Sequence, residues 1–145
     1  MIRVLLPSAP IDVADELARL EALAVGAVAS FTGLVRRDDG VEALTLEHYP
    51  GATDTALRTL AEGAAARWSL AAATIVHRVG RMLPGERIVF VATAARHRAA
   101  ALDACAYLID RLKTDAPFWK REETAAGARW VEARATDDDA ARRWS

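Results

Sequence analysis

Residues 98–122 read RAAALDACAYLIDRLKTDAPFWKRE and carry the clearest structural signal in the chain. Alanine, leucine and other good helix formers fill the segment as far as Lys113. Pro117 ends any helix soon afterwards, because the residue before a proline disfavours helical dihedral angles. We therefore predict a helix over 98–113, followed by a short connection into an aromatic and basic segment.

On a helical wheel of about 100° per residue, two cations project onto the apolar side of this helix. The apolar stripe comprises Leu102, Cys105, Ala106, Ile109 and Leu112. Arg98 and Lys113 lie on the same stripe, one at each end, and lysine is seldom fully buried unless it is paired. Both residues are terminal, so their charged ends can also reach water, and the helix dipole favours a lysine at the C-terminus. The pattern alone leaves a functional and a purely structural interpretation open.

A second lysine, Lys120, follows just beyond the predicted helix end. Two ammonium groups brought close together lower each other's pKa, and partial desolvation by Phe118 and Trp119 adds to that effect. A lysine in such surroundings can act as a general base, a nucleophile or an anion clamp. The spacing does not choose among these roles.

The two ends of the predicted helix are too far apart to share one small ligand. Arg98 and Lys113 are fifteen residues apart, which is roughly 22 Å along a straight helix. Either the two cations serve different purposes, or a dimer brings Arg98 of one protomer to Lys113 of the other.

Hydrophobic periodicity and turn residues predict the remaining elements. Strands are expected over 2–6, 26–35, 43–49, 73–79, 86–94 and 129–135, helices over 12–23 and 53–68, and a helical turn over 138–142. Asp12 is the expected N-cap of the first helix, and Thr53 or Asp54 that of the second.

The order of these elements indicates the fold class. The strands 26–35 and 43–49 look like a hairpin, and a turn at Pro84-Gly85 joins 73–79 to 86–94. Hairpins mixed with helical crossovers predict an α+β sandwich, in which helices pack on one face of a mostly antiparallel sheet.

Composition narrows the class of protein. The 145 residues, 52% of them hydrophobic, fit a single domain over 1–145 with a packed core. The one cysteine, Cys105, excludes an intramolecular disulfide and fits a core position, and no Cys/His spacing suggests a metal site. Pro7 and Pro10 interrupt the N-terminal segment, which makes neither a signal peptide nor a membrane span. We therefore expect a cytoplasmic protein.

The net charge of the chain argues against nucleic acid as a partner. A net charge of −1 gives no overall attraction to nucleic acid. Local basic clusters at Arg36-Arg37, 96–98 and Lys120-Arg121 suit a small anionic ligand or the acidic tail of a partner, although each cluster by itself can be solvated surface.

A series of motifs in a fixed order runs through the chain. They are Phe31–Arg36 (FTGLVR), Leu44–Gly51 (LTLEHYPG), His77–Gly80 (HRVG), Pro84–Glu86 (PGE), His97-Arg98, Leu112–Glu122 (LKTDAPFWKRE) and Trp130–Arg134 (WVEAR). A single one would be weak evidence, but the ordered series, from about residue 26 to residue 144, strongly resembles the large subunit of molybdopterin synthase.

The resemblance implies a definite fold and activity. The family's large subunit forms a homodimer with an α/β hammerhead fold, and a small ubiquitin-like subunit docks at each end to give a heterotetramer. The small subunit's C-terminal Gly-Gly, as a thiocarboxylate, threads into the large subunit's pocket. Two sulfurs pass to cyclic pyranopterin monophosphate, giving the dithiolene of molybdopterin. The resemblance thus implies a sulfurtransferase that needs neither a cofactor nor a cysteine of its own, since the sulfur arrives on the tail.

The resemblance also implies the catalytic residues. Lys113 and Lys120 match the family's essential lysines, and Arg36 matches a pocket arginine that suits a phosphate or the tail carboxylate. Leu34 stands where relatives often carry lysine, so a third basic contact is expected to be absent. The turn at 37–40 is shorter than in many relatives, which is expected to alter the pocket rim but not the chemistry.

Further substrate-binding positions follow from the same match. His97 and Arg98 match a pair that reaches the pocket from the neighbouring protomer, which agrees with the length of the helix. Arg121 and Glu122 match the edge of the pocket. His48 lies within a predicted strand, as does His77, and this placement favours structural roles for both.

Two other functions fit the residues. A lysine Schiff-base enzyme would use a partly desolvated Lys113 as its nucleophile. A non-catalytic module could instead bind a ubiquitin-like tail without chemistry. Binding of nucleic acid is the weakest hypothesis, because no basic face with interleaved aromatic residues is present.

Overall fold

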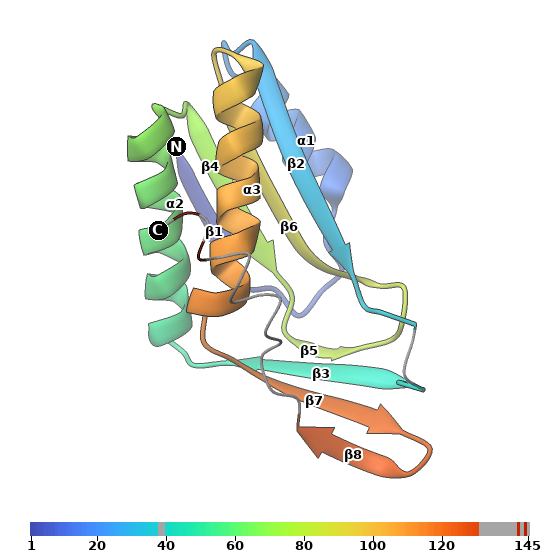
Figure 1. Cartoon of the computed structure of the whole chain (residues 1–145). Coiled ribbons are helices and arrows are strands. Elements are labelled where there is room, and N and C mark those ends of the chain that lie inside the picture. Colours follow the sequence, from blue (N-terminus) through green and yellow to red (C-terminus); the bar gives the residue numbers. More distant parts are fainter. Residues whose placement is uncertain (38–39, 131–141, 143, 145) are drawn as a thin grey trace.

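The computed structural model describes residues 1–37, 40–130, 142 and 144. Its elements follow in the order β1 (Ile2–Leu5), α1 (Val13–Glu21), β2 (Ala27–Leu34), β3 (Ala43–His48), α2 (Ala52–Trp68), β4 (Ala72–His77), β5 (Gly80–Met82), β6 (Arg87–Ala95), α3 (Arg98–Asp115), β7 (Phe118–Thr124) and β8 (Gly127–Trp130). Within this part of the chain, the strands form two four-stranded sheets (Figure 1).

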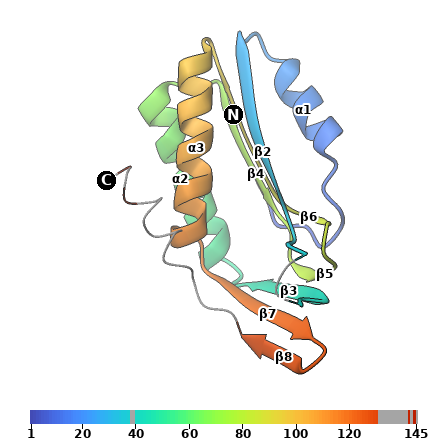
Figure 2. The ribbon, with the colours of Figure 1, turned by 45° about the vertical axis from the view of Figure 1, so that its right-hand side comes forward.

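The first sheet has the strand order β1-β4-β6-β2, and all its neighbours are antiparallel except β1 and β4. β4 is buried along its whole length because helices cover both faces of the sheet. α2 and α3 pack on one face, where Leu57 and Leu108 share a core with Ile75. α1 packs on the other face, where Leu20 shares a second core with Phe90 (Figure 2). The predicted α+β class is confirmed, and α1 adds a layer on the face that the prediction left bare.

The second sheet, β5-β3-β7-β8, is antiparallel throughout and lies beyond the C-terminal end of α3 (Figure 1). Leu46 of β3 belongs to the main core. Its cross-strand partner on β7 is Lys120, whereas Thr45 pairs with Arg121. Since successive side chains of a strand point to opposite faces, Lys120 and Arg121 lie on opposite faces of this sheet.

The predicted hairpin of 26–35 with 43–49 is wrong. β2 pairs with β6 in the first sheet, whereas β3 pairs with β5 and β7 in the second. The N–H of Val35 donates to the carbonyl of Glu86, and its carbonyl accepts from the N–H of Gly85. These two bonds fasten the end of β2 to the turn before β6, so the chain leaves the first sheet before β3 begins.

The sequence pattern also misses β5 and β7. The charged residues of β7 (FWKREET) resemble a loop, but β3 and β8 flank the segment and take up its backbone hydrogen bonds. β8 begins at Gly127, ahead of the predicted strand over 129–135. The residues after Trp130 in that strand, and those of the predicted turn at 138–142 apart from Arg142, lie outside the described residues.

α3 begins at Arg98 as predicted, but its buried side differs from the predicted stripe. The buried residues are Ala101, Ala104, Cys105, Leu108 and Leu112. Leu102 is 59% exposed. Apolar residues occur on several sides of this helix, so the wheel is ambiguous, and two small alanine side chains share the buried side with larger residues. Cys105 is confirmed as a core residue, and its burial raises the pKa of the thiol to about 11.

The start of α1 follows its prediction. Asp12 caps the helix and accepts a hydrogen bond of 3.0 Å from the N–H of Asp15. In the described part of the chain, no helix is long and apolar enough to cross a membrane.

Candidate active site

A buried hydroxyl ties two junctions of the chain together, the one between β3 and α2 and the one between α3 and β7. The side chain of Thr53 accepts a hydrogen bond of 2.9 Å from the N–H of Tyr49 and donates one of 2.7 Å to the carbonyl of Pro117. Thr53 is therefore not the predicted cap of α2, and Asp54 is not either, because Gly51 occupies that position with a φ of 85° that suits glycine. The bonds hold the two elements that carry the predicted catalytic lysines.

A stack of buried His77 on partly buried Phe118 joins the end of β4 to the start of β7. The ring of His77 lies 4.2 Å from the ring of Phe118, with 27° between their planes. His77 is only 3% exposed, and its Nδ1 lies 3.0 Å from the carbonyl oxygen of Arg78. Because a carbonyl can only accept, Nδ1 carries the proton of a neutral ring, and Nε2 is left with a lone pair.

Both predicted catalytic lysines act on this ring. Burial is the main cause that lowers the pKa of His77, from 6.5 to about 3; the Arg78 carbonyl opposes the shift, and the charges of Lys113 and Lys120 add to it. Lys113 comes from the last turn of α3 and Lys120 from β7. The structure therefore brings both lysines within electrostatic range of one buried imidazole.

The numbers of lysine and arginine residues in the sequence also point to this cluster, independently of the sequence motifs. The chain has two lysines and seventeen arginines, and both lysines belong to this cluster. Arginine keeps its charge at every physiological pH, whereas lysine can give up its proton. Lys113 and Lys120 are therefore the two basic side chains in this cluster that can give up a proton near neutral pH.

The remaining predicted residues of β7 divide between the two faces of the sheet. Glu122 lies on the face of Lys120, and its carboxylate accepts a hydrogen bond of 3.0 Å from Arg129. Arg121 points to the other face, together with Trp119. The structure does not bring Arg121 to the lysines.

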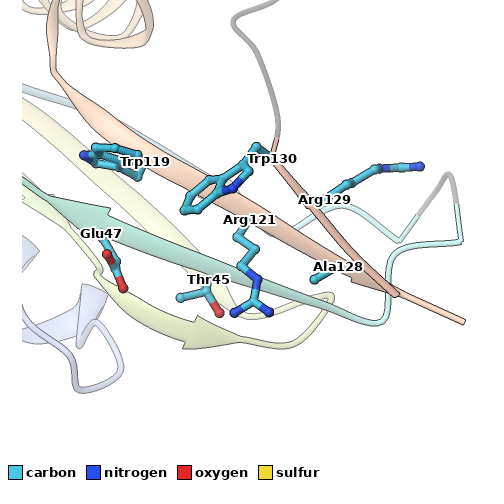
Figure 3. A pocket seen from close by; sticks show the side chains of 7 residues that line it. All are labelled: Thr45, Glu47, Trp119, Arg121, Ala128, Arg129 and Trp130. Carbon is cyan, nitrogen blue, oxygen red and sulfur yellow. The ribbon is translucent and has the colours of Figure 1, made fainter. Parts of the chain in front are cut away.

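On the face of the second sheet opposite Lys120, Arg121 lines a hollow of about 500 Å³ (Figure 3). The hollow is lined by Thr45, Glu47, Trp119, Arg121, Ala128, Arg129 and Trp130. The rings of Trp119 and Trp130 lie 5.3 Å apart, and Tyr49 extends the row at 5.4 Å from Trp119. Trp119 therefore lines a pocket wall, but a wall on the opposite side of β7 from Lys120.

The predicted anion clamp, Arg36, lies next to Val35 just after β2. Its side chain is exposed. The backbone before it is fixed by the bonds of Val35 to Gly85 and Glu86. The end of β2, just before Arg36, is the end of the first sheet that faces the second sheet (Figure 1).

His97 and Arg98 lie at the far end of α3 from Lys113. His97 occupies the N-cap position and Arg98 begins the helix, and both side chains are exposed. α3 has 18 residues, which corresponds to about 27 Å at the usual rise per residue. Within one chain these two residues do not reach the lysines (Figure 1).

The cluster around His77 has groups whose chemistry suits proton transfer and anion binding. It combines two amines, a neutral imidazole and the partly buried ring of Phe118. Across the described residues, no three His, Cys, Asp or Glu side chains gather where they could hold a metal ion.

Comparison with known proteins identifies relatives over the whole chain. The model of the MoaE protein family matches residues 6–115. The molybdopterin synthase catalytic subunit of Salmonella typhimurium is 49% identical over 98% of this chain and 97% of its own. That of Pseudomonas aeruginosa is 52% identical over 94% of both chains.

Solved structures agree with these relatives. A molybdopterin biosynthesis MoaE protein from Burkholderia ambifaria has a TM-score of 0.86 and 48% identity, over 99% of this chain and 98% of its own. The molybdopterin synthase from Staphylococcus aureus has a TM-score of 0.80 and 29% identity, over 90% of this chain and 96% of its own. The chain therefore belongs to the MoaE protein family, the family of molybdopterin synthase catalytic subunits.

Proposed function

We propose that this chain is the catalytic subunit of a molybdopterin synthase, a sulfurtransferase. It transfers sulfur from the C-terminal thiocarboxylate of a small ubiquitin-like subunit to cyclic pyranopterin monophosphate and so forms the dithiolene of molybdopterin. The observation that carries the proposal is the convergence of Lys113 and Lys120, the only lysines of the sequence, on one buried ring. Relatives about half identical bear the name of this enzyme. A single domain over 1–145 and a cytoplasmic location stay predictions.

The chemistry asks for anion binding and proton transfer. Each sulfur transfer, completed by a water molecule that supplies the replacing oxygen, returns the thiocarboxylate tail as a carboxylate, so the site must accommodate an anion before and after reaction. Lys113 and Lys120 offer ammonium groups to that anion and, when neutral, an amine that accepts a proton. Arg36 adds a permanent charge that suits the substrate phosphate. Arg121 and Glu122 stay proposed contacts of the pocket edge, on opposite faces of β7.

A homodimer would complete the site with His97 and Arg98. β2 is an edge strand, and its Phe31 and Leu34 are exposed by 40% and 55%. Leu102 of α3, which packs beside β2, is also exposed. Exposed apolar side chains on a sheet edge are typical of an interface.

The symmetry of such a dimer explains the distance along α3. In a two-fold dimer, each β2 would lie antiparallel to its copy, and each α3 would run opposite to the partner's α3. The Arg98 end of one protomer would then lie beside the Lys113 end of the other. We propose this homodimer as the centre of a heterotetramer with two small subunits.

The test of the function combines the purified chain, a thiocarboxylated small subunit and cyclic pyranopterin monophosphate, and measures the dithiolene product. We expect product with the thiocarboxylated subunit and none with the same subunit ending in a carboxylate. No product, beside a working synthase under the same conditions, would overturn the proposal.

The same assay separates the two other functions. A Lys113→Ala variant that still converts the pterin at the normal rate would remove Lys113 from the catalytic machinery and favour a binding module. Borohydride trapping of a carbonyl compound on Lys113, without any response to the thiocarboxylated subunit, would favour a Schiff-base enzyme.

A further inference from the structure

His77 is a buried titratable group that the proposed sulfur transfer does not use. Its ring stacks on Phe118 at 4.2 Å and its Nδ1 bonds to the Arg78 carbonyl at 3.0 Å. These two contacts fix both the plane of the ring and its tautomer. A residue that only filled space beside Phe118 would need neither nitrogen, so packing alone does not explain a histidine at this position.

The groups around His77 come from several elements. Lys113 of α3 and Lys120 of β7 supply the positive charges that act on the ring. The next cation along the chain, Arg78, is turned away, because its guanidinium donates to Glu86 at 3.2 Å and to the carbonyl of Ser8 at 3.0 Å. On β6, the cross-strand partner of His77 is the apolar Val89.

Strand register links the ring of His77 to the face that carries Lys120, through Phe118 and independently of any charge. Phe118 and Lys120 are two residues apart on β7, so both side chains lie on the same face of the second sheet. Phe118 is the residue on which His77 stacks. Lys113 approaches from α3, whose end is fixed by the bond between Thr53 and Pro117.

We infer that His77 is a positioning residue of the site: its uncharged imidazole, locked by Phe118 and the Arg78 carbonyl, sets how readily Lys113 or Lys120 gives up its proton. The ring lines the lysine site without adding a third positive charge. The lone pair on Nε2 favours the ammonium form of a lysine that reaches it, because a hydrogen bond to the charged form stabilises that form. The inference rests on the proposed function, because tuning a lysine matters only if the site is catalytic. The effect of His77 on the lysines can nevertheless be measured without sulfur transfer.

The first test needs no variant. The sequence has three histidines, so ¹⁵N-histidine labelling gives few signals. We expect His77 to remain the neutral Nδ1–H tautomer between about pH 5 and 8, the range in which histidine ordinarily titrates. Protonation of His77 within this range, or an Nε2–H tautomer, would overturn the inference.

The second test measures the lysines. Because Lys113 and Lys120 are the only lysines, ¹³Cε-lysine labelling gives two signals, which Lys113→Arg and Lys120→Arg assign. His77→Phe keeps an aromatic ring beside Phe118 and removes both nitrogens. We expect the titration midpoint of at least one lysine to fall by about half a pH unit or more. His77→Gln, which restores a polar group near the position of Nε2, should recover part of the shift.

His48→Phe is the matched control. His48 lies on β3 opposite Phe118, so this variant makes the same chemical change close to the stack. It should leave both lysine midpoints in place. Unchanged lysine midpoints in a folded His77→Phe variant would overturn the inference, and so would equal shifts in His77→Phe and His48→Phe. If His77→Phe does not fold, the lysine titration of His77→Gln decides.

The two proposals can fail separately. The lysine titrations use the chain without the small subunit or the pterin, so they decide the role of His77 even if no sulfur is transferred. If sulfur transfer is observed, the acid limb of its pH–rate profile should move in His77→Phe in the same direction as the lysine midpoint. A loss of rate with an unmoved profile would indicate a structural role alone.

Discussion

The hydroxyl of Thr53 donates a hydrogen bond of 2.7 Å to the carbonyl of Pro117, a residue 64 positions further along the chain. The same hydroxyl accepts a bond of 2.9 Å from the N–H of Tyr49. Thr53 is 0% exposed, so water cannot replace it in either bond. One side chain thereby fixes Pro117, which lies between the element that carries Lys113 and the one that carries Lys120.

Thr53→Val should destabilise the fold. Valine keeps the shape of threonine but leaves the N–H of Tyr49 and the carbonyl of Pro117 without this partner, which should lower the free energy of unfolding by about 1–3 kcal/mol. Urea unfolding measures the change. Thr55→Val, at an exposed position of the same helix, should stay within about 0.5 kcal/mol of the wild type. Equal stability of the two variants would show that the bonds contribute nothing.

Lys113→Arg and Lys120→Arg test whether the site needs a removable proton. Both variants keep the positive charge, but arginine does not deprotonate. If either lysine transfers a proton, the rate of sulfur transfer in a single turnover should fall by roughly 10²-fold or more in that variant. Arg111→Lys is the control, since Arg111 pairs with Asp115 on the surface of the same helix. Normal rates in both lysine variants would leave them as anion clamps only.

Subunit mixing tests whether the site is shared between protomers. Lys113→Ala and Arg98→Ala should each be nearly inactive as homodimers. In a mixed dimer, one site would combine the intact Lys113 of one protomer with the intact Arg98 of the other. Random exchange should therefore restore about a quarter of the wild-type activity, because half of the dimers are mixed and each has one good site. A mixture that stays inactive after verified exchange contradicts the shared site.

The sequence predicts local elements well where a covalent or local rule applies. Pro117 ends α3 near the predicted point, and Asp12 caps α1. The hairpin of 26–35 with 43–49 fails because strand pairing depends on distant partners: Val35 bonds to Gly85 and Glu86, which no local pattern shows. β7 is missed for the same reason, since its polar residues become a strand only between β3 and β8.

The sequence predicts some relationships within the candidate site and misses others, for a physical reason in each case. The nearness of Lys113 and Lys120 follows from a forced helix end, which the sequence displays. The separation of Lys120 from Arg121 follows from strand alternation, which needs β7 to be known as a strand. The sequence favours a structural role for His77, because its place in an apolar strand does not show that β7 and α3 bring the charges of Lys120 and Lys113 to act on it.

The buried ring of His77 should also make stability depend on pH. Its pKa is about 3 in the folded protein and 6.5 ordinarily. Above pH 6.5 the ring is neutral in both states, so its full contribution to stability is present. As the pH falls below 6.5, His77 of the unfolded chain binds a proton, whereas the buried ring of the folded protein stays neutral. Stability therefore decreases until the folded ring protonates near pH 3. The slope approaches about 1.4 kcal/mol per pH unit.

Urea unfolding of the wild type and of His77→Phe checks this between pH 6.5 and 5, where most carboxylates remain ionised. The wild type should lose roughly 1.5 kcal/mol from His77 over this interval, and His77→Phe should lose correspondingly less, because phenylalanine binds no proton. His48→Phe is measured alongside, so that only the pH dependence lost beyond this control is attributed to His77. If His77→Phe keeps the wild-type pH dependence, His77 is protonated in the folded protein at pH 5, and the inference of a neutral imidazole is wrong.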